Sequence, residues 1–137
     1  MAARYLVIGL GRFGTALALR LAEQGAEVIA VDSELEYVEA VKDRIGHALQ
    51  LDSTDPAALQ AVDARSCTLA IVAMGEGFEA AVLTVAALKE SGVPRVLARA
   101  RNSRHARILK AVGADETIEV ESEVGRRLAE SLSKGRT

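Results

Sequence analysis

The stretch from Tyr5 to Gly14 constrains the fold of this chain more than any other part of the sequence. It reads YLVIGLGRFG, so an apolar run leads into Gly9, Gly11 and Gly14 with the spacing G-x-G-x-x-G. From Phe13 onward, apolar residues recur at helical spacing. We therefore predict a buried strand, a glycine loop and a helix, with the free N–H groups of the loop and the positive end of the helix dipole facing a phosphate.

Each glycine has its own predicted task in such a loop. Gly9 allows the tight turn from strand to helix, Gly11 lets backbone approach the phosphate, and Gly14 lets the helix pack close to the strand. Arg12 lies inside the loop, where a guanidinium can bind phosphate oxygens, unless it is only a solvent-exposed residue at the start of a helix. The predicted contacts therefore include Leu10 and Phe13 as well, and cover Gly9 to Gly14.

An acid completes the pattern. A second predicted strand, Glu27 to Asp32, ends in a carboxylate that follows the loop at close to the roughly 20-residue spacing of a ribose-binding acid. We predict that Asp32 binds the adenosine ribose, with Ser33 beside it. The alternative is an ordinary tight turn, with Asp32 as a helix cap.

The rest of the chain repeats strand and helix. Further strands are predicted at 47–51, 69–73, 95–100 and 116–120. Helices are predicted at 35–45 and 122–134. Three more lie between these two: one begins at Pro56 with Asp55 as its cap, one ends at about Ser91, and one runs from its cap Ser103 to Gly113. This alternation predicts an α/β Rossmann-type, doubly wound fold, with a six-stranded parallel sheet in the order 3-2-1-4-5-6. The expected organisation is a nucleotide-binding domain at 1–121 and a dimerising crossover helix at 122–137.

Ligands of doubly wound folds lie at the carboxyl ends of the strands. Further ligand contacts are therefore predicted in the loops after the third and fourth strands. For Ser53 and Thr54, the alternative is that their side chains only cap a turn. The first loop contributes Asp52, Ser53 and Thr54. The second loop runs from Ala73 to Gly77, with Ala73, Met74 and Gly75 as its assigned contacts and a plain loop as the alternative.

Charge and composition exclude several function classes. A formal net charge of −2 gives no general attraction to nucleic acid, and no apolar run is long enough to span a bilayer. The single cysteine, Cys67, suits a reducing compartment, so we expect a cytoplasmic protein. The sequence also contains two charged clusters that are either two solvated faces or partners across a symmetric contact. The basic cluster is Arg95, Arg99, Arg101, Arg104 and Arg107, and the acidic cluster that follows it is Asp115, Glu116, Glu119, Glu121 and Glu123.

Taken together, the motifs resemble one family. They are VIGLGRFG at 7–14, Val31-Asp32, IVAMG at 71–75 and Gly113-Ala114-Asp115. The chain resembles the N-terminal domain of RCK proteins (regulators of potassium conductance, also called TrkA-N or KTN domains), most closely the KtrA type.

The resemblance implies a cytoplasmic regulatory subunit of a potassium transporter or channel. Such domains bind ATP, ADP or NAD(H), pair as homodimers and assemble in rings, here an octamer, below a membrane subunit. It also implies that Arg99 faces the cleft, and that Glu121 faces a divalent ion, Mg²⁺ or Ca²⁺, at the dimer contact. No catalytic residue is predicted. A nicotinamide-dependent oxidoreductase and a bare dimerisation module are the alternatives.

Overall fold

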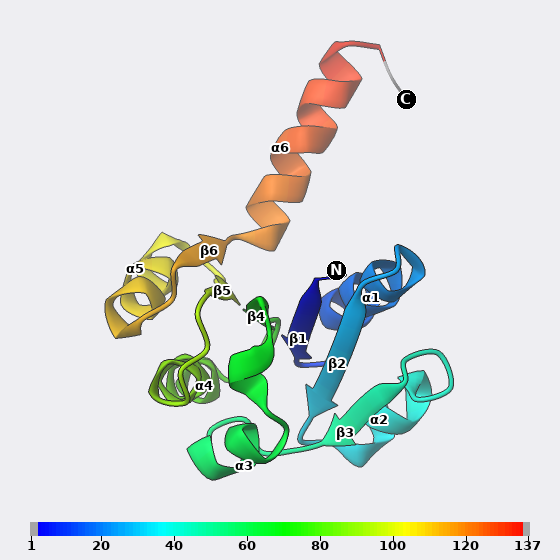
Figure 1. The fold of residues 1–137 in the computed structure, drawn as a ribbon. Helices are drawn as coiled ribbons and strands as arrows, with labels where there is room; N and C mark the ends of the chain where they lie inside the picture. The colour runs from blue at the N-terminus through cyan, green and yellow to red at the C-terminus, as the bar shows by residue number, and fades with distance from the viewer. Residues whose placement is uncertain (1–2, 136–137) are drawn as a thin grey trace.

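The computed structural model describes residues 3–135, and in them it shows the predicted fold (Figure 1). The outer predicted bounds, residues 1 and 137, lie outside that range. Six parallel strands form one sheet in the order β3-β2-β1-β4-β5-β6, which confirms the predicted order. The strands are β1 (Arg4–Ile8), β2 (Glu27–Asp32), β3 (His47–Gln50), β4 (Leu69–Val72), β5 (Val96–Arg99) and β6 (Glu116–Ile118).

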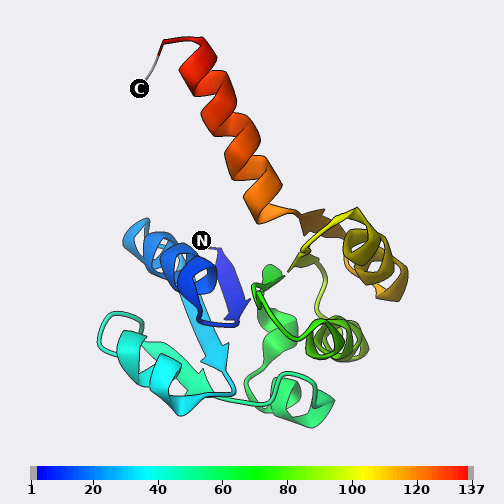
Figure 2. The ribbon, with the colours of Figure 1, turned by 180° about the vertical axis from the view of Figure 1, so that it is seen from behind.

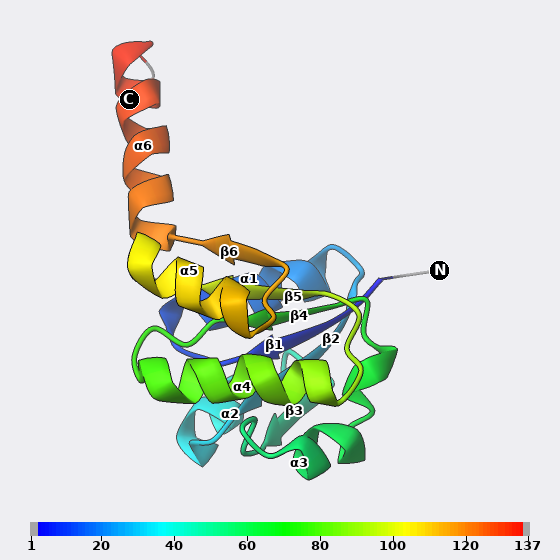
Figure 3. The ribbon, with the colours of Figure 1, turned by 90° about the vertical axis from the view of Figure 1, so that its left-hand side faces the viewer.

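Helices cover both faces of the sheet (Figure 3). They are α1 (Arg12–Glu23), α2 (Leu35–Val41), α3 (Pro56–Ala61), α4 (Phe78–Glu90), α5 (Ser103–Val112) and α6 (Val120–Ser133), with a short 3-10 turn at Ala64–Ser66. The side chains of β1 alternate between the two faces: Val7 packs with α1 and α2, whereas Leu6 and Ile8 pack with α3, α4 and α5. This two-sided burial explains the nearly continuous apolar runs of the central strands.

The last helix does not share in this packing. Figures 1 and 2 show α6 standing away from the sheet and the other helices. None of its described residues is buried, and Val124, Leu128 and Leu132 are at least half exposed. An apolar stripe at four-residue spacing is thus left without a partner among the residues that the structure describes. No helix within residues 3–135 is long and apolar enough to cross a bilayer.

Several predicted boundaries are wrong. Helix α6 begins at Val120 rather than after Ser122, and β6 ends at Ile118, because the acidic residues Glu121 and Glu123 suit the first turn of a helix. Asn102, not Ser103, caps α5: its Oδ1 accepts from the backbone N–H of His105 at 2.8 Å. Helix α2 ends at Val41, and turns replace the rest of the predicted segment up to residue 45. The predicted Asp55 cap of α3 is confirmed.

Candidate functional site: a nucleotide cleft

The three glycines of the loop occupy three different environments. Gly9 has φ +99°, a conformation that favours glycine, and its backbone lies against Met74. Gly14 packs so closely that a Cβ there would lie 1.7 Å from the carbonyl oxygen of Gly9. Around Gly11, by contrast, a Cβ would meet no described atom within 4 Å. The turn and the close packing agree with the predicted tasks of Gly9 and Gly14, and the open space agrees with that of Gly11.

The loop presents free donors. Gly11 is the N-cap of α1, and no described side chain caps the N–H groups of that first turn. These groups and the positive end of the helix dipole are available to an anion. Arg12, the first residue of α1, is exposed and lines the cleft. Leu10 contributes only its backbone, because its side chain is buried against α1 and α2.

Asp32 links the loop to the end of β2. Its Oδ2 accepts from the N–H of Leu10 at 2.7 Å, and its Oδ1 accepts from the N–H of Glu34 at 2.9 Å. Each carboxylate oxygen has a second lone pair, so both can still accept a hydroxyl proton from a ligand. Ser33 is exposed, and its carbonyl accepts from Nε2 of Gln50. The acid is thus held at the glycine loop, as the spacing predicts for a ribose-binding residue.

The Asp52-Ser53-Thr54 segment mainly stabilises its own turn. Asp52 Oδ1 accepts from both Oγ1 and the N–H of Thr54, and these hydrogen bonds lower the pKa of the Asp52 carboxyl group. The Ser53 hydroxyl is buried and lies 2.8 Å from Oγ1 of Thr84. The segment still lines a hollow of about 240 Å³ that it shares with Asp32 and Ser33. The hydroxyls of Ser53 and Thr54 therefore already have partners inside the protein.

A larger cleft of about 780 Å³ runs across the carboxyl ends of the strands. This volume is in the range of small-molecule sites. At one end lie Gly11, Arg12 and Asp32, and at the other Arg99, Arg101 and Glu121. The predicted residues Ala73, Met74 and Gly75 form the middle of its lining. The structure therefore brings the separate predicted loops together around one space.

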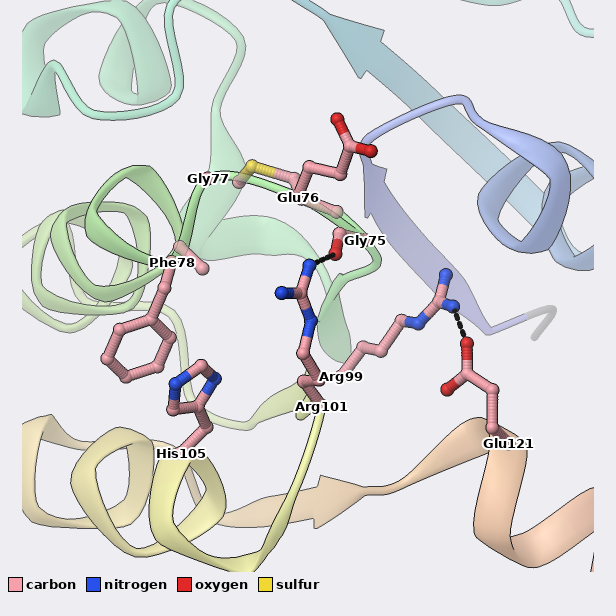
Figure 4. A pocket seen from close by; sticks show the side chains of 10 residues that line it. Gly75, Glu76, Gly77, Phe78, Arg99, Arg101, His105 and Glu121 are labelled. Atoms are coloured by element: carbon pink, nitrogen blue, oxygen red, sulfur yellow. Dashed lines mark hydrogen bonds and ion pairs between the residues drawn. The ribbon is translucent and has the colours of Figure 1, made fainter.

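Arg99 lines this cleft together with Glu121, toward which its side chain extends (Figure 4). Its guanidinium lies 5.4 Å from the ring centroid of Phe13, and its Nη2 donates to Oε2 of Glu121 at 2.5 Å. Hydrogen bonding to its own backbone N–H, and then to Arg99, lowers the pKa of Glu121. Within residues 3–135, no group of three potential metal-ligating acids, histidines or cysteines is found. Glu121 thus has a cationic partner inside the chain.

Sequence reasoning missed several residues that line the cleft. They are Glu34, Tyr37 and Arg101 in the cleft itself, and Phe78 and His105 in a smaller pocket beside it. Arg101 was assigned only to the basic cluster, although it directly follows the strand that ends at Arg99, which is the usual signal for a ligand contact. Parts of the two charged clusters pair with each other. Within the chain, Arg95 pairs with Glu116 and Arg99 with Glu121.

A family model for the TrkA-N domain matches residues 5–120. The chain belongs to the TrkA-N family. This confirms the resemblance that the motifs indicated. Among relatives, the Ktr system potassium uptake protein A of Bacillus subtilis (strain 168) is 37% identical over 130 residues, which are 95% of this chain and 59% of that protein. Protein C of the same system and organism is 36% identical over 132 residues, or 96% and 60%. The chain therefore spans about 60% of the length of these relatives.

Solved structures support the fold. The NAD(P)-binding domain of an exopolyphosphatase-related protein from Archaeoglobus fulgidus superposes with a TM-score of 0.85 at 24% identity, over 95% of this chain and 97% of that one. The GsuK channel bound to NAD superposes with a TM-score of 0.81 at 14% identity, over 93% of this chain and 23% of that one. At these identities the comparison shows a shared architecture.

Proposed function

We propose that this chain is the nucleotide-sensing part of a regulatory subunit of a potassium transporter or channel. The observation that carries the proposal is the hydrogen bond of 2.7 Å between Asp32 and the Leu10 amide, at the mouth of a cleft of about 780 Å³. This hydrogen bond holds a carboxylate beside the glycine loop, which is the arrangement that a ribose acceptor and a phosphate-binding loop require. Relatives named as potassium uptake proteins supply the physiological setting. ATP or ADP is the proposed ligand, and NAD(H) the alternative.

The choice of nucleotide depends on the end of the ligand that is far from Asp32. Both ATP and NADH carry a free adenosine 2′-hydroxyl, so Asp32 accepts either. Beyond its pyrophosphate, NADH presents a neutral ribose and a nicotinamide, whereas ATP presents another phosphate. Arg12 and Arg99 both line this cleft, and charge-assisted bonds to phosphate are about twice as strong as neutral ones. The charges favour ATP and ADP.

Arg12→Ala is expected to weaken the binding of ATP by roughly one to two decades in affinity. The binding of AMP should weaken less, because AMP lacks the distal phosphates. Arg12 is exposed, so the substitution should leave the fold intact. Titration calorimetry with AMP, ADP, ATP and NADH measures the affinity of each nucleotide for the parent and for the variant. Arg20→Ala, at an exposed arginine of the same helix, is the matched control. Tightest binding of NADH, with an equal loss for all four ligands, would reverse the assignment.

Asp32 is expected to discriminate against a 2′-phosphate. Its carboxylate would accept from the free hydroxyl of NADH and repel the phosphate of NADPH, so NADPH should bind at least about tenfold more weakly. The thermal shift produced by each dinucleotide at equal concentration measures the difference, because a ligand bound only by the folded state raises stability. Equal shifts by NADH and NADPH would remove Asp32 from this role.

We further propose a homodimer formed through α6. A two-fold interface presents the same patch twice, which suits the exposed stripe of Val124, Leu128 and Leu132. Leu128→Lys is expected to give a folded monomer, because that side chain is 57% exposed within the protomer and supports no packing there. Leu49→Lys, at an exposed leucine of β3, is the control and should remain dimeric. Sedimentation velocity decides, and a parent that is monomeric at high micromolar concentration contradicts the proposal.

Other parts of the proposal concern the assembled system. They are an octameric ring, a membrane potassium transporter or channel as partner, a cytoplasmic location at the membrane through that partner, and Mg²⁺ or Ca²⁺ beside Glu121 when phosphates are bound. A carboxylate next to phosphates is repulsive without a cation, and hard divalent ions suit oxygen ligands. If Mg²⁺ and EDTA give the same ATP affinity in the calorimetric series, the ion has no part in binding.

We propose no catalytic role for the chain. An oxidoreductase would need a group that exchanges a proton with substrate and a pocket to hold that substrate. The histidine that lines the pocket beside the cleft, His105, is stacked on Phe78 with ring centroids 3.8 Å apart. An assay of nicotinamide turnover distinguishes an oxidoreductase from the proposed regulatory subunit. A bare dimerisation module is separated by the same thermal shifts, because it would bind no nucleotide.

A further inference from the structure

A small pocket beside the cleft is lined both by predicted contacts, among them Gly75 and Arg99, and by Arg101, which was not predicted as a contact (Figure 4). It has a volume of about 100 Å³ and lies between the loop after β4, the end of β5 and the start of α5. Figure 4 shows the side chains of Arg99 and Arg101 leaving the same segment in different directions, one toward Glu121 and the other toward Gly75. The carboxylate of Glu76 points away from both guanidinium groups in this view.

Arg99 is fixed in position at this pocket. Its side chain is only 19% exposed, it lies over the ring of Phe13, and it packs within 3.3 Å of the place where a Cβ on Gly75 would lie. A guanidinium this enclosed needs an anion, since a buried charge without a partner is costly. Glu121 supplies that anion, although its own side chain is 71% exposed. The site thus holds a carboxylate from the first turn of α6.

Arg101 has less of its charge compensated. Its Nη2 donates to the carbonyl oxygen of Gly75 at 3.2 Å, and no acid within residues 3–135 forms an ion pair with it. A carbonyl oxygen is neutral, and a guanidinium has five N–H donors, so Arg101 keeps both charge and donors for a ligand. The stacked rings of Phe78 and His105 line the same pocket. Two guanidinium groups therefore share one small space, with a single described carboxylate paired to them.

We propose that Arg99 and Arg101 form an anion subsite for the terminal phosphate of a nucleoside diphosphate or triphosphate, and that Glu121 fills this subsite as an internal anion when no nucleotide is bound. The proposal rests on the proposed function, because it assigns the distal phosphates of the same ligand. Phosphate oxygens match the fork of a guanidinium better than one carboxylate oxygen does, and they bring more charge. The nucleotide therefore displaces Glu121 from Arg99.

Charge along the cleft supports this orientation. Asp32 gives the end near β2 an acceptor that suits ribose hydroxyls, whereas Arg99 and Arg101 make the end near β5 cationic. A ligand with hydroxyl groups at one end and phosphates at the other matches both ends. AMP, with a single phosphate at the glycine loop, would not reach the subsite. Its affinity should therefore not depend on Arg101 or Glu121.

The test is titration calorimetry with AMP and ADP in EDTA, so that no divalent ion bridges acid and phosphate. Glu121→Gln, which removes the charge and keeps the shape, is expected to raise ADP affinity by about two- to fivefold, since the pair it removes is exposed on one side. Arg101→Ala is expected to lower ADP affinity by about tenfold or more. Neither substitution should change AMP affinity. Arg104→Ala, at an exposed arginine of α5 that does not line the cleft, is the matched control.

Three outcomes overturn the subsite. They are weaker or unchanged ADP binding by Glu121→Gln, unchanged ADP binding by Arg101→Ala, and equal changes for AMP and ADP. All three presuppose that the parent binds both nucleotides, so they leave the proposed function standing. A parent that binds no adenine nucleotide in calorimetry contradicts the proposed function and the subsite together. Both side chains are exposed, so the variants are expected to fold, and circular dichroism verifies this.

Discussion

Replacing Gly11 with valine is expected to abolish nucleotide binding while the chain stays folded. A Cβ at Gly11 meets nothing within 4 Å, and its backbone lies in the extended region that any residue adopts, so the fold has no reason to respond. The same open space is where a phosphate must approach the loop amides. A branched side chain there would hold the phosphate away, and affinity should fall by at least about a hundredfold.

Gly46→Val is the matched control for this experiment. Gly46 is also free of neighbours within 4 Å, but it lies in the turn before β3 and not in the cleft. Calorimetry with ADP should give parental affinity for the control and no measurable heat for Gly11→Val. Thermal melts of both variants should match the parent without ligand. If folded Gly11→Val keeps its affinity for ADP, the glycine loop is not the phosphate site.

Replacing Gly14 with alanine is expected to have the opposite result, a loss of stability. The added Cβ would lie 1.7 Å from the carbonyl oxygen of Gly9 and 3.2 Å from Cβ of Ala73. The first contact is with backbone that is itself held by a hydrogen bond from Gly9 N–H to the Val31 carbonyl at 2.9 Å. The helix must therefore move off the sheet, and we expect a cost of about 3–5 kcal/mol, at the upper end of overpacking effects.

For a chain of this length, such a cost lowers the melting temperature by roughly 10–20 °C. Circular dichroism at 222 nm during a thermal scan measures it. Gly11→Ala, three positions earlier in the same loop, adds the same methyl group in open space and should melt with the parent. A Gly14→Ala variant that melts within about 2 °C of the parent would show that α1 can shift without cost.

Much of the fold could be predicted from the sequence because local and long-range signals agree. Each strand is a short apolar run closed by polar or glycine residues, and buried parallel strands require that pattern. Strand order followed from the alternation with helices together with the fixed hand of crossovers. The prediction of helix and strand boundaries failed where two sequence signals compete. In Val120-Glu121-Ser122-Glu123, Ser122 resembles a cap, but the acids already suit the first turn of a helix.

The candidate site was predicted only where a motif carries its own geometry. Gly9, Gly14 and Asp32 could be placed because backbone constraints fix their spacing. The roles of Ser53 and Arg101 could not, because they depend on side-chain direction across elements. Ser53 turns inward to a hydroxyl on α4, and Arg101 turns toward the loop after β4. Such contacts join segments 26 or 31 residues apart, and no local pattern encodes them.

Helix α6 has mechanical consequences because it leaves the body of the protein at a single point. The Arg99–Glu121 pair lies at its base, and its 14 residues make a lever about 21 Å long. A tilt of about 10° at Val120 would move the far end by about 4 Å. In a two-fold pair joined through these levers, the tilts of both copies add, so the two bodies would swing relative to each other by about twice that angle. An exchange of anions at Arg99 that tilts α6 would thereby displace a whole domain.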